Sequence, residues 1–183
     1  MNDPASGALL ISDPFLRDPH FMRTVVFLCE HSENGSFGFV LNRPFEQTLD
    51  EFVPELEGYM VPVFYGGPVQ PDTLHFLHCL PHLIPGGQQV VPGVYWGGDF
   101  NMVVDHIRNH QLDRDKIRFF LGYSGWSEGQ LANEISEKSW LTSQGSPRLV
   151  FHPDAGSVWP DAIREMDGKY HPIINYPIDP QLN

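Results

Sequence analysis

The segment from Arg23 to Asn42 limits the possible folds more than any other part of the chain. Two runs rich in apolar and β-branched residues, RTVVFLCEH and SFGFVLN, flank the short polar sequence SENG. Asn34-Gly35 tolerates positive φ at both positions, which is a strong signal for a tight hairpin. The first run is apolar through its middle without alternation, so it is expected to form a central strand buried on both faces. The sequence therefore predicts an antiparallel hairpin inside a covered sheet.

Further strands are predicted where short apolar runs end in glycine or proline, and helices where a capping residue precedes a run with helical spacing. The predicted strands are 7–11, 23–31, 36–42, 61–67, 73–79, 90–96, 116–124 and 148–151. The predicted helices are 49–58, 100–110, 128–140 and 158–166, capped by Thr48 with Glu51, by Asp99, by Ser127 with Gln130, and by Ser157. The proline-rich segment from residue 170 is expected to be an irregular tail.

These elements predict an α+β fold. The early hairpin requires antiparallel pairing, while the later alternation of strands and helices permits parallel pairs, so one mixed, strongly curved sheet with helices packed against it is expected. A chain of 183 residues fits a single domain, which we place over residues 1–183.

The charge of the chain disfavours several classes of partner. The formal net charge is −12, and the 11 lysines and arginines are scattered without a basic run. Such a chain repels nucleic acid and anionic membranes, so no direct binding to either is expected. Cys29 and Cys79 are too few for a disulfide framework, and no leader-like or membrane-spanning run is present. We therefore expect a cytoplasmic protein.

Ligand-type side chains gather in HFLHCLPH, which contains His75, His78, Cys79 and His82. Zinc binds such residues, but alternation along a strand places His75 and Cys79 on one face and His78 on the other. No metal or cofactor is predicted, although metal binding by this cluster stays open.

Two other motifs have structural and chemical interpretations. Glu30 and His31 could form an acid–base pair, but neighbours on a strand face opposite ways, so His31 is expected to orient a loop. YGGP (65–68) lacks the lysine of a phosphate loop and is read as a tight turn with close backbone approach.

The sequence GYSGW (122–126) lies between a predicted strand and a predicted helix, which is the setting of a nucleophile elbow. The elbow pattern ends in glycine, whereas this sequence has Trp126 there. The only later histidines, His152 and His171, both precede prolines. We therefore interpret the two glycines as letting the strand turn tightly into the helix, with Ser124 not a nucleophile. A serine hydrolase using Ser124 is an alternative hypothesis.

Three blocks follow one another along the chain: GALLISDPFLRDPHFMRTVVFLCEHSENGSFGFVLNRP, FYGGPVQPD and FFLGYSGWSEGQLANEI. In this order they resemble the YqgE/AlgH family of bacterial proteins. The resemblance runs from Gly7 to Ala162 and is loosest between His75 and Phe100. The family often has alanine where Ser124 stands and glycine where Ser127 stands. The positions that match its motifs are Arg23, Glu30, His31, Gly35, Gly38, Asn42, Pro44, Gly66, Gly67, Pro68, Val69, Gly122, Tyr123, Gly125, Trp126, Gly129, Gln130 and Leu131.

The resemblance implies a bacterial cytoplasmic protein built around a curved, barrel-like sheet. It implies little about activity, because the family is largely uncharacterised and its regulator label comes from a genetic link to alginate production. We expect a non-enzymatic regulatory protein that binds a small molecule or a protein partner and affects transcription only indirectly, if at all. A direct DNA-binding regulator is the second alternative. The candidate binding residues are Arg23, Glu30, His31, Asn42, Gly66, Gly67, Pro68, Tyr123, Ser124, Trp126 and Gln130.

Overall fold

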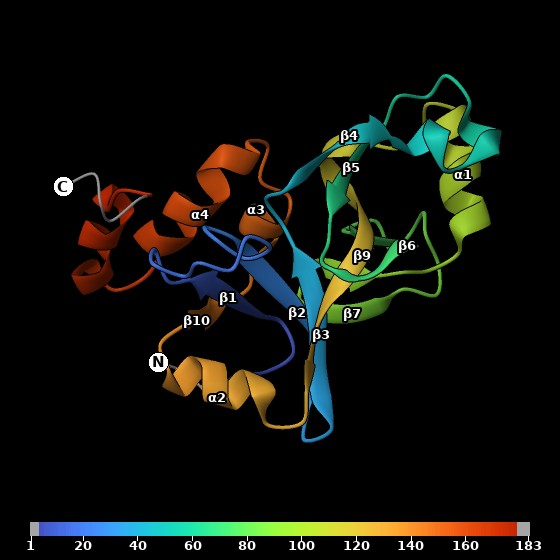
Figure 1. The fold of residues 1–183 in the computed structure, drawn as a ribbon. Helices are drawn as coiled ribbons and strands as arrows, with labels where there is room; N and C mark the ends of the chain where they lie inside the picture. Colours follow the sequence, from blue (N-terminus) through green and yellow to red (C-terminus); the bar gives the residue numbers. More distant parts are fainter. Residues whose placement is uncertain (1–3, 179–183) are drawn as a thin grey trace.

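The fold is a strongly curved sheet with helices packed against it (Figure 1). The structure, a computed structural model, describes residues 4–178. The strands are β1 (Ala8–Ser12), β2 (Val25–Ser32), β3 (Gly35–Val40), β4 (Pro44–Thr48), β5 (Pro62–Tyr65), β6 (Val69–His78), β7 (Gln88–Val91), β8 (Val94–Trp96), β9 (Ile117–Ser127) and β10 (Trp140–Gln144). The α-helices are α1 (Phe100–Arg108), α2 (Gln130–Ser136), α3 (Pro147–Val150) and α4 (Ala155–Arg164).

Strand β9 belongs to both halves of the sheet. Residues 124–127 pair with β3, from which the sheet continues through β2 and β1 to β10. Residues 117–121 lie between β5 and β6, and from β6 the sheet continues through β8 to β7. The β5–β9 pair is parallel and the β6–β9 pair antiparallel, so the sheet is mixed. The predicted class, α+β with one mixed and strongly curved sheet, is confirmed.

The predicted hairpin is present as β2 and β3, with its turn shifted by one residue. Ser32 pairs with Gly35, so the turn consists of Glu33 and Asn34. Of the residues Ser32 to Gly35, only Gly35 has positive φ, at 139°, whereas Asn34 was also expected to have positive φ. A side chain on Gly35 would place Cβ 2.6 Å from the carbonyl oxygen of Trp126 on β9. Glycine therefore allows the hairpin to pair closely with β9.

Alternate residues of β2 are buried on opposite faces, as the unbroken apolar run predicts. Val25 and Phe27 join the central cluster of the core, while Val26 and Leu28 join a second cluster under α2. All four side chains are fully buried. The prediction of a strand buried on both faces is confirmed.

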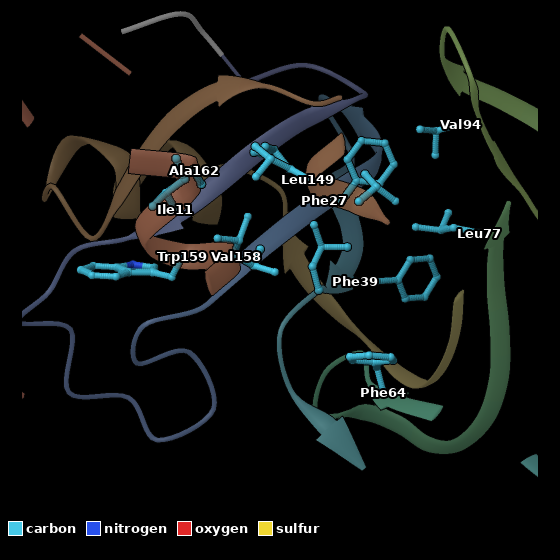
Figure 2. Close-up of a cluster of buried hydrophobic side chains, with 14 of the residues drawn as sticks. Ile11, Phe27, Phe39, Phe64, Leu77, Val94, Leu149, Val158, Trp159 and Ala162 are labelled. Atoms are coloured by element: carbon cyan, nitrogen blue, oxygen red, sulfur yellow. The ribbon is translucent and has the colours of Figure 1, made fainter. Parts of the chain in front are cut away.

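The central cluster draws side chains from both halves of the sheet. Figure 2 shows Phe27 and Phe39 from the first half, with Leu77 and Val94 from the second, lining a common interior. Helix α4 adds Trp159 and its neighbours to the same cluster. Strands on opposite sides of the interior can share one cluster because the sheet curves around it.

Helix α2 is tied to the sheet by one carboxylate. Glu134 Oε2 accepts hydrogen bonds from the indole N–H of Trp126, at 2.9 Å, and of Trp140, at 2.8 Å. Trp126 lies on β9 and Trp140 on β10, and their exposed fractions are 5% and 1%. A single side chain therefore satisfies two buried donors on different strands.

Helix α1 begins where the sequence predicts. The Asp99 carboxylate caps it by accepting from the Met102 N–H at 3.2 Å. Val103, Val104 and Ile107 are its buried residues, and they pack with the outward face of β9. Met102 was expected to share the inner face but is 36% exposed.

The prediction for residues 148–151 is wrong. They were expected to form a strand, but Pro147–Val150 is helix α3, because Ser146 caps it and Pro147 occupies its first position. The last strand is instead β10, which pairs along β1 from Ala8 opposite Gln144 to Ser12 opposite Trp140.

The prediction of one continuous helix at 49–58 is also wrong. The segment forms two separate 3₁₀ turns, Leu49–Glu51 and Pro54–Leu56. Glu51 does accept from the Thr48 N–H, as the capping pattern predicts, but Pro54 lacks the N–H that a continuous helix needs. The preceding segment, Pro44–Thr48, is β4, where no strand was predicted.

Two further helices have other boundaries than predicted. The helix expected at 128–140 is confined to α2, and Gly129, with φ of 72°, is its capping residue. The helix expected at 158–166 begins at Ala155, because Asp154 caps it by accepting from the Gly156 N–H, while the Ser157 hydroxyl donates to Asp154.

The tail is more ordered than the prolines indicate. Gly168–Asn175 is a 3₁₀ helix, and Tyr170, Ile173 and Ile174 pack against the central cluster. Packing of these three side chains overrides the irregularity expected from Pro172. Residues 179–183 of the predicted tail lie outside the described part of the chain.

Candidate functional site

The GYSGW segment lies inside β9 and marks the point where this strand changes partners. Gly122 has φ of 66°, a left-handed conformation that favours glycine. A Cβ at Gly66 would lie 2.4 Å from the Gly122 carbonyl oxygen, and one at Gly67 would lie 2.2 Å from Tyr123 backbone atoms. The YGGP turn and the GYSGW segment therefore touch backbone to backbone. The close approach predicted for YGGP is confirmed, and Pro68 after it is exposed.

The expected strand-to-helix elbow at Ser124 is absent. Strand β9 continues to Ser127, and the chain turns only at Gly129, so the two glycines of GYSGW bend a strand and do not end it. Ser124 is 0% exposed, and its Oγ donates to the Gly66 carbonyl at 3.0 Å. Within residues 4–178 no histidine nitrogen is hydrogen bonded to this hydroxyl.

An open cavity of about 590 Å³ lies beside this segment. We call it the aromatic groove. Its aromatic and apolar lining comes from the hairpin, β6, β8 and β9, namely Phe37, Val69, Trp96, Tyr123 and Trp126, together with the ring of His75. Glu30, Ser32 and Ser36 add polar groups. Among the predicted candidates, the groove thus brings together Glu30, Tyr123 and Trp126.

The rings of the groove hold one another in place. Phe37 packs edge-to-face on Trp96, with centroids 4.9 Å apart, and on Tyr123 at 5.9 Å. His75 packs edge-to-face on Tyr123 at 6.0 Å. Such pairs are favourable arrangements of ring quadrupoles. Burial lowers the pKa of His75, so its ring is neutral at pH 7 and keeps this wall uncharged.

Glu30 and His31 face different cavities, as strand alternation predicts. Glu30 is exposed and lines the aromatic groove, whereas His31 lines a separate depression beside α2. His31 Nδ1 lies 2.6 Å from the Ser36 hydroxyl, and the backbone N–H of His31 donates to the Ser6 hydroxyl. His31 therefore holds the hairpin. Gln130, at the start of α2, holds the turn between β9 and α2, because its side-chain oxygen accepts from the Ser127 N–H.

The histidine cluster of β6 does not converge. The Leu80 N–H donates to His78 Nδ1 at 3.1 Å, so Nε2 carries the proton and donates to the Gly97 carbonyl at 2.9 Å. Both ring nitrogens of His78 are thereby occupied. Burial lowers the pKa of His78 and favours this neutral form. In the described residues no three such side chains gather around a possible ion.

Arg23 and Asn42 lie elsewhere, in a third cavity of about 390 Å³ between the start of β2 and α4. We call it the arginine pocket, since Arg23, Arg43 and Arg164 all line it. It has no lining residue in common with the aromatic groove. The predicted candidates therefore do not form one site: they are divided among the aromatic groove, the arginine pocket, the glycine contact between YGGP and β9, and the region beside α2 that contains His31 and Gln130.

A family model described as AlgH-like (DUF179) matches residues 9–171 of the chain. The chain belongs to the AlgH-like family. A UPF0301 protein of Chlorobium luteolum is 44% identical over 179 residues, covering 98% of this chain and 95% of the relative. A UPF0301 protein of Parabacteroides distasonis is 40% identical, covering 98% and 92%.

Solved structures show the same AlgH-like fold. The AlgH protein of Pseudomonas aeruginosa, solved in solution, has a TM-score of 0.71 and 28% identity, covering 91% of this chain and 94% of that one. Protein DIP2367 of Corynebacterium diphtheriae, solved by X-ray crystallography, has a TM-score of 0.81 and 23% identity, covering 96% and 94%.

Several groove residues are absent from the motif-based candidates of this AlgH-like chain. Phe37, His75 and Trp96 come together only because β8 lies beside β6 and β3 lies beside β9. Phe37 is two residues from the core residue Phe39 on β3, so the two side chains share one face of the strand, and this spacing is visible in the sequence. The sequence around Trp96 indicates only an edge strand.

Proposed function

We propose that the protein is a non-enzymatic binding protein, and that its aromatic groove holds a ligand with an apolar or aromatic body and a positively charged group. The observation that carries the proposal is the groove itself, where aromatic rings from three strands surround one opening with a carboxylate beside it. A volume of about 590 Å³ falls within the range of sites for small molecules or short peptide segments.

The chemistry of the lining supports a cationic ligand. Electron-rich ring faces attract ammonium and guanidinium groups, and Glu30 is free to pair with such a group, because it forms no ion pair within the described residues. The net charge of −12 favours the approach of cations over anions.

We place this binding in the cytoplasm, with any effect on transcription exerted through the ligand or a partner. The scattered basic residues and the net charge support this proposal against direct DNA binding. No helix in the part of the chain described by the structure has the length and apolarity needed to cross a bilayer.

The test compares tryptamine with indole-3-acetate, which share an indole body and differ in the sign of their charge. Tryptamine is expected to shift the NMR signals of Phe37, Trp96 and Tyr123, and to bind at least about tenfold more tightly than indole-3-acetate. Glu30→Gln should remove most of that preference, because the paired carboxylate is lost.

Glu57→Gln is the matched control, since Glu57 is also exposed and lies outside the groove. It makes the same change of charge and should leave the preference for tryptamine intact. Equal binding of the two probes to the native protein, or shifts confined to other surfaces, would contradict the proposal. If tryptamine is preferred, native mass spectrometry of protein isolated from cells is the experiment that identifies the resident ligand.

The serine hydrolase alternative has its own test. A serine-directed fluorophosphonate is not expected to label the folded protein, because Ser124 is buried and its hydroxyl is held by the Gly66 carbonyl. If the reagent labelled the native protein and Ser124→Ala abolished the labelling, the hydrolase hypothesis would be restored. An active serine hydrolase treated in parallel serves as the control for reagent quality.

A further inference from the structure

Arg23 adopts a backbone conformation that is costly for its residue type. Its φ is 51°, in the left-handed region, which is unfavourable for a residue other than glycine. The Asn42 side chain holds it there, because Asn42 Nδ2 donates to the Arg23 carbonyl at 2.9 Å and Asn42 Oδ1 accepts from the Val25 N–H at 3.0 Å. The fold thus holds Arg23 in a strained backbone conformation just before β2.

The side chain of Arg23 is fixed but not neutralised. Its guanidinium carbon lies 4.7 Å from the centre of the Trp159 ring, on helix α4, and one terminal nitrogen donates to the Tyr176 carbonyl. Its Nε is buried and has no hydrogen-bond partner within residues 4–178. Nor does any carboxylate of that range pair with it.

Arg43 presents a second unneutralised guanidinium to the same pocket. Its Nη2 donates to the Met22 carbonyl at 2.5 Å, and no described carboxylate pairs with it. Arg164, the third arginine, is exposed and already bound to Asp161. The pocket therefore holds two guanidinium groups whose remaining donors have no acceptor within residues 4–178.

The carboxylates near the pocket are engaged with other groups. Asp154 accepts from the Gly156 N–H and from Ser157 at the start of α4. Asp161 accepts from Arg164 and lies 3.0 Å from His152 Nε2. The positive groups that face the cavity thus exceed the negative ones, in a chain whose net charge is −12.

From this geometry we infer that the arginine pocket binds a phosphate group, either as free phosphate or as part of a small phosphate ester. A guanidinium fork matches the oxygens of phosphate, and two of them together suit a dianion. The volume of about 390 Å³ is larger than a phosphate ion needs, which leaves room for an organic group beside Trp159. This site is separate from the aromatic groove, so it stands whether or not the proposed function does.

The experiment titrates inorganic phosphate, ribose 5-phosphate and neutral ribose into the full chain at constant ionic strength. The readout is the indole N–H signal of Trp159 in a two-dimensional NMR spectrum, with those of Trp126 and Trp140 as internal references. We expect at least one phosphate probe to shift the Trp159 signal with a dissociation constant of about 1 mM or below, and ribose to have no effect. A tighter constant for the ester identifies an organic phosphate as the natural ligand, and a tighter constant for the ion identifies free phosphate.

Arg43→Gln is expected to weaken binding of the phosphate probe at least about tenfold, the loss of one charge-assisted contact. Arg108→Gln is the matched control, because Arg108 is exposed at the end of α1 and lies outside the pocket. It should leave the affinity unchanged. The unshifted Trp126 and Trp140 signals show that each variant is folded. Absence of any shift with both phosphate probes, or equal weakening by both substitutions, would overturn the inference.

Discussion

Replacing Gly67 with alanine is expected to destabilise the fold by about 3 kcal/mol or more, because a clash is added to the cost of a φ of 153°, which favours glycine. The new Cβ would lie 2.2 Å from backbone atoms of Tyr123 and 2.4 Å from the Ser124 nitrogen. Backbone cannot yield as the end of a side chain does, and these atoms belong to the strand on which both halves of the sheet are built. Urea unfolding, followed by circular dichroism, measures the loss.

Gly58→Ala separates this clash from the backbone cost of positive φ. Gly58 has φ of 84°, but a Cβ there would meet nothing within 4 Å. Its replacement should therefore cost only about 1–2 kcal/mol, the usual price of a left-handed residue. If Gly67→Ala proved no more harmful than Gly58→Ala, the backbone contact between YGGP and β9 would be looser than the structure shows.

The second large effect is expected for Glu134→Ala. Removing this carboxylate leaves the indole N–H groups of Trp126 and Trp140 without their acceptor, and each buried unsatisfied donor costs about 1–3 kcal/mol. The expected total loss in the free energy of unfolding is about 2–5 kcal/mol. Chemical unfolding followed by tryptophan fluorescence reports both the stability and the surroundings of the two indoles.

Two variants, one on α2 and one just after it, sharpen this result. Glu134→Gln keeps an oxygen that is able to accept from both indoles, because both donate to the same Oε2, so it should retain most of the stability. Glu137→Ala removes an exposed carboxylate of the neighbouring segment and should change stability by less than about 0.5 kcal/mol. A Glu134→Ala variant as stable as Glu137→Ala would show that water replaces the carboxylate.

The elements predicted correctly from sequence are those whose signals are local. The β2–β3 hairpin follows from two apolar runs around Asn34-Gly35, and α1 follows from Asp99 as its cap. The curvature of the sheet was implied by the family resemblance more than by any residue pattern. Of the candidate groove residues, Tyr123 and Trp126 were predicted because they stand in a distinctive motif.

The elements predicted wrongly depend on distant partners. WLTSQ becomes β10 because it pairs with β1, more than a hundred residues away, and no local pattern reveals that pairing. GYSGW resembles a turn because glycine marks turns, whereas here Gly122 bends a strand at the place where its partner changes. The groove residues Phe37, His75 and Trp96 are separated in sequence and meet only through the sheet order.

The position of β9 in the chain has a consequence for biosynthesis. Strands β3 and β6 both need β9 to complete their hydrogen bonding, yet β9 leaves the ribosome only after residues 117–127 are made. At about 5–20 residues per second, the interval between Val40 and Ser127 lasts roughly 4 to 17 seconds. During that time the nascent chain carries open strand edges, which are templates for pairing with other chains. A β9 segment from a neighbouring nascent chain fits the same edges, so exchange of β9 between two copies is the expected misassembly at high expression.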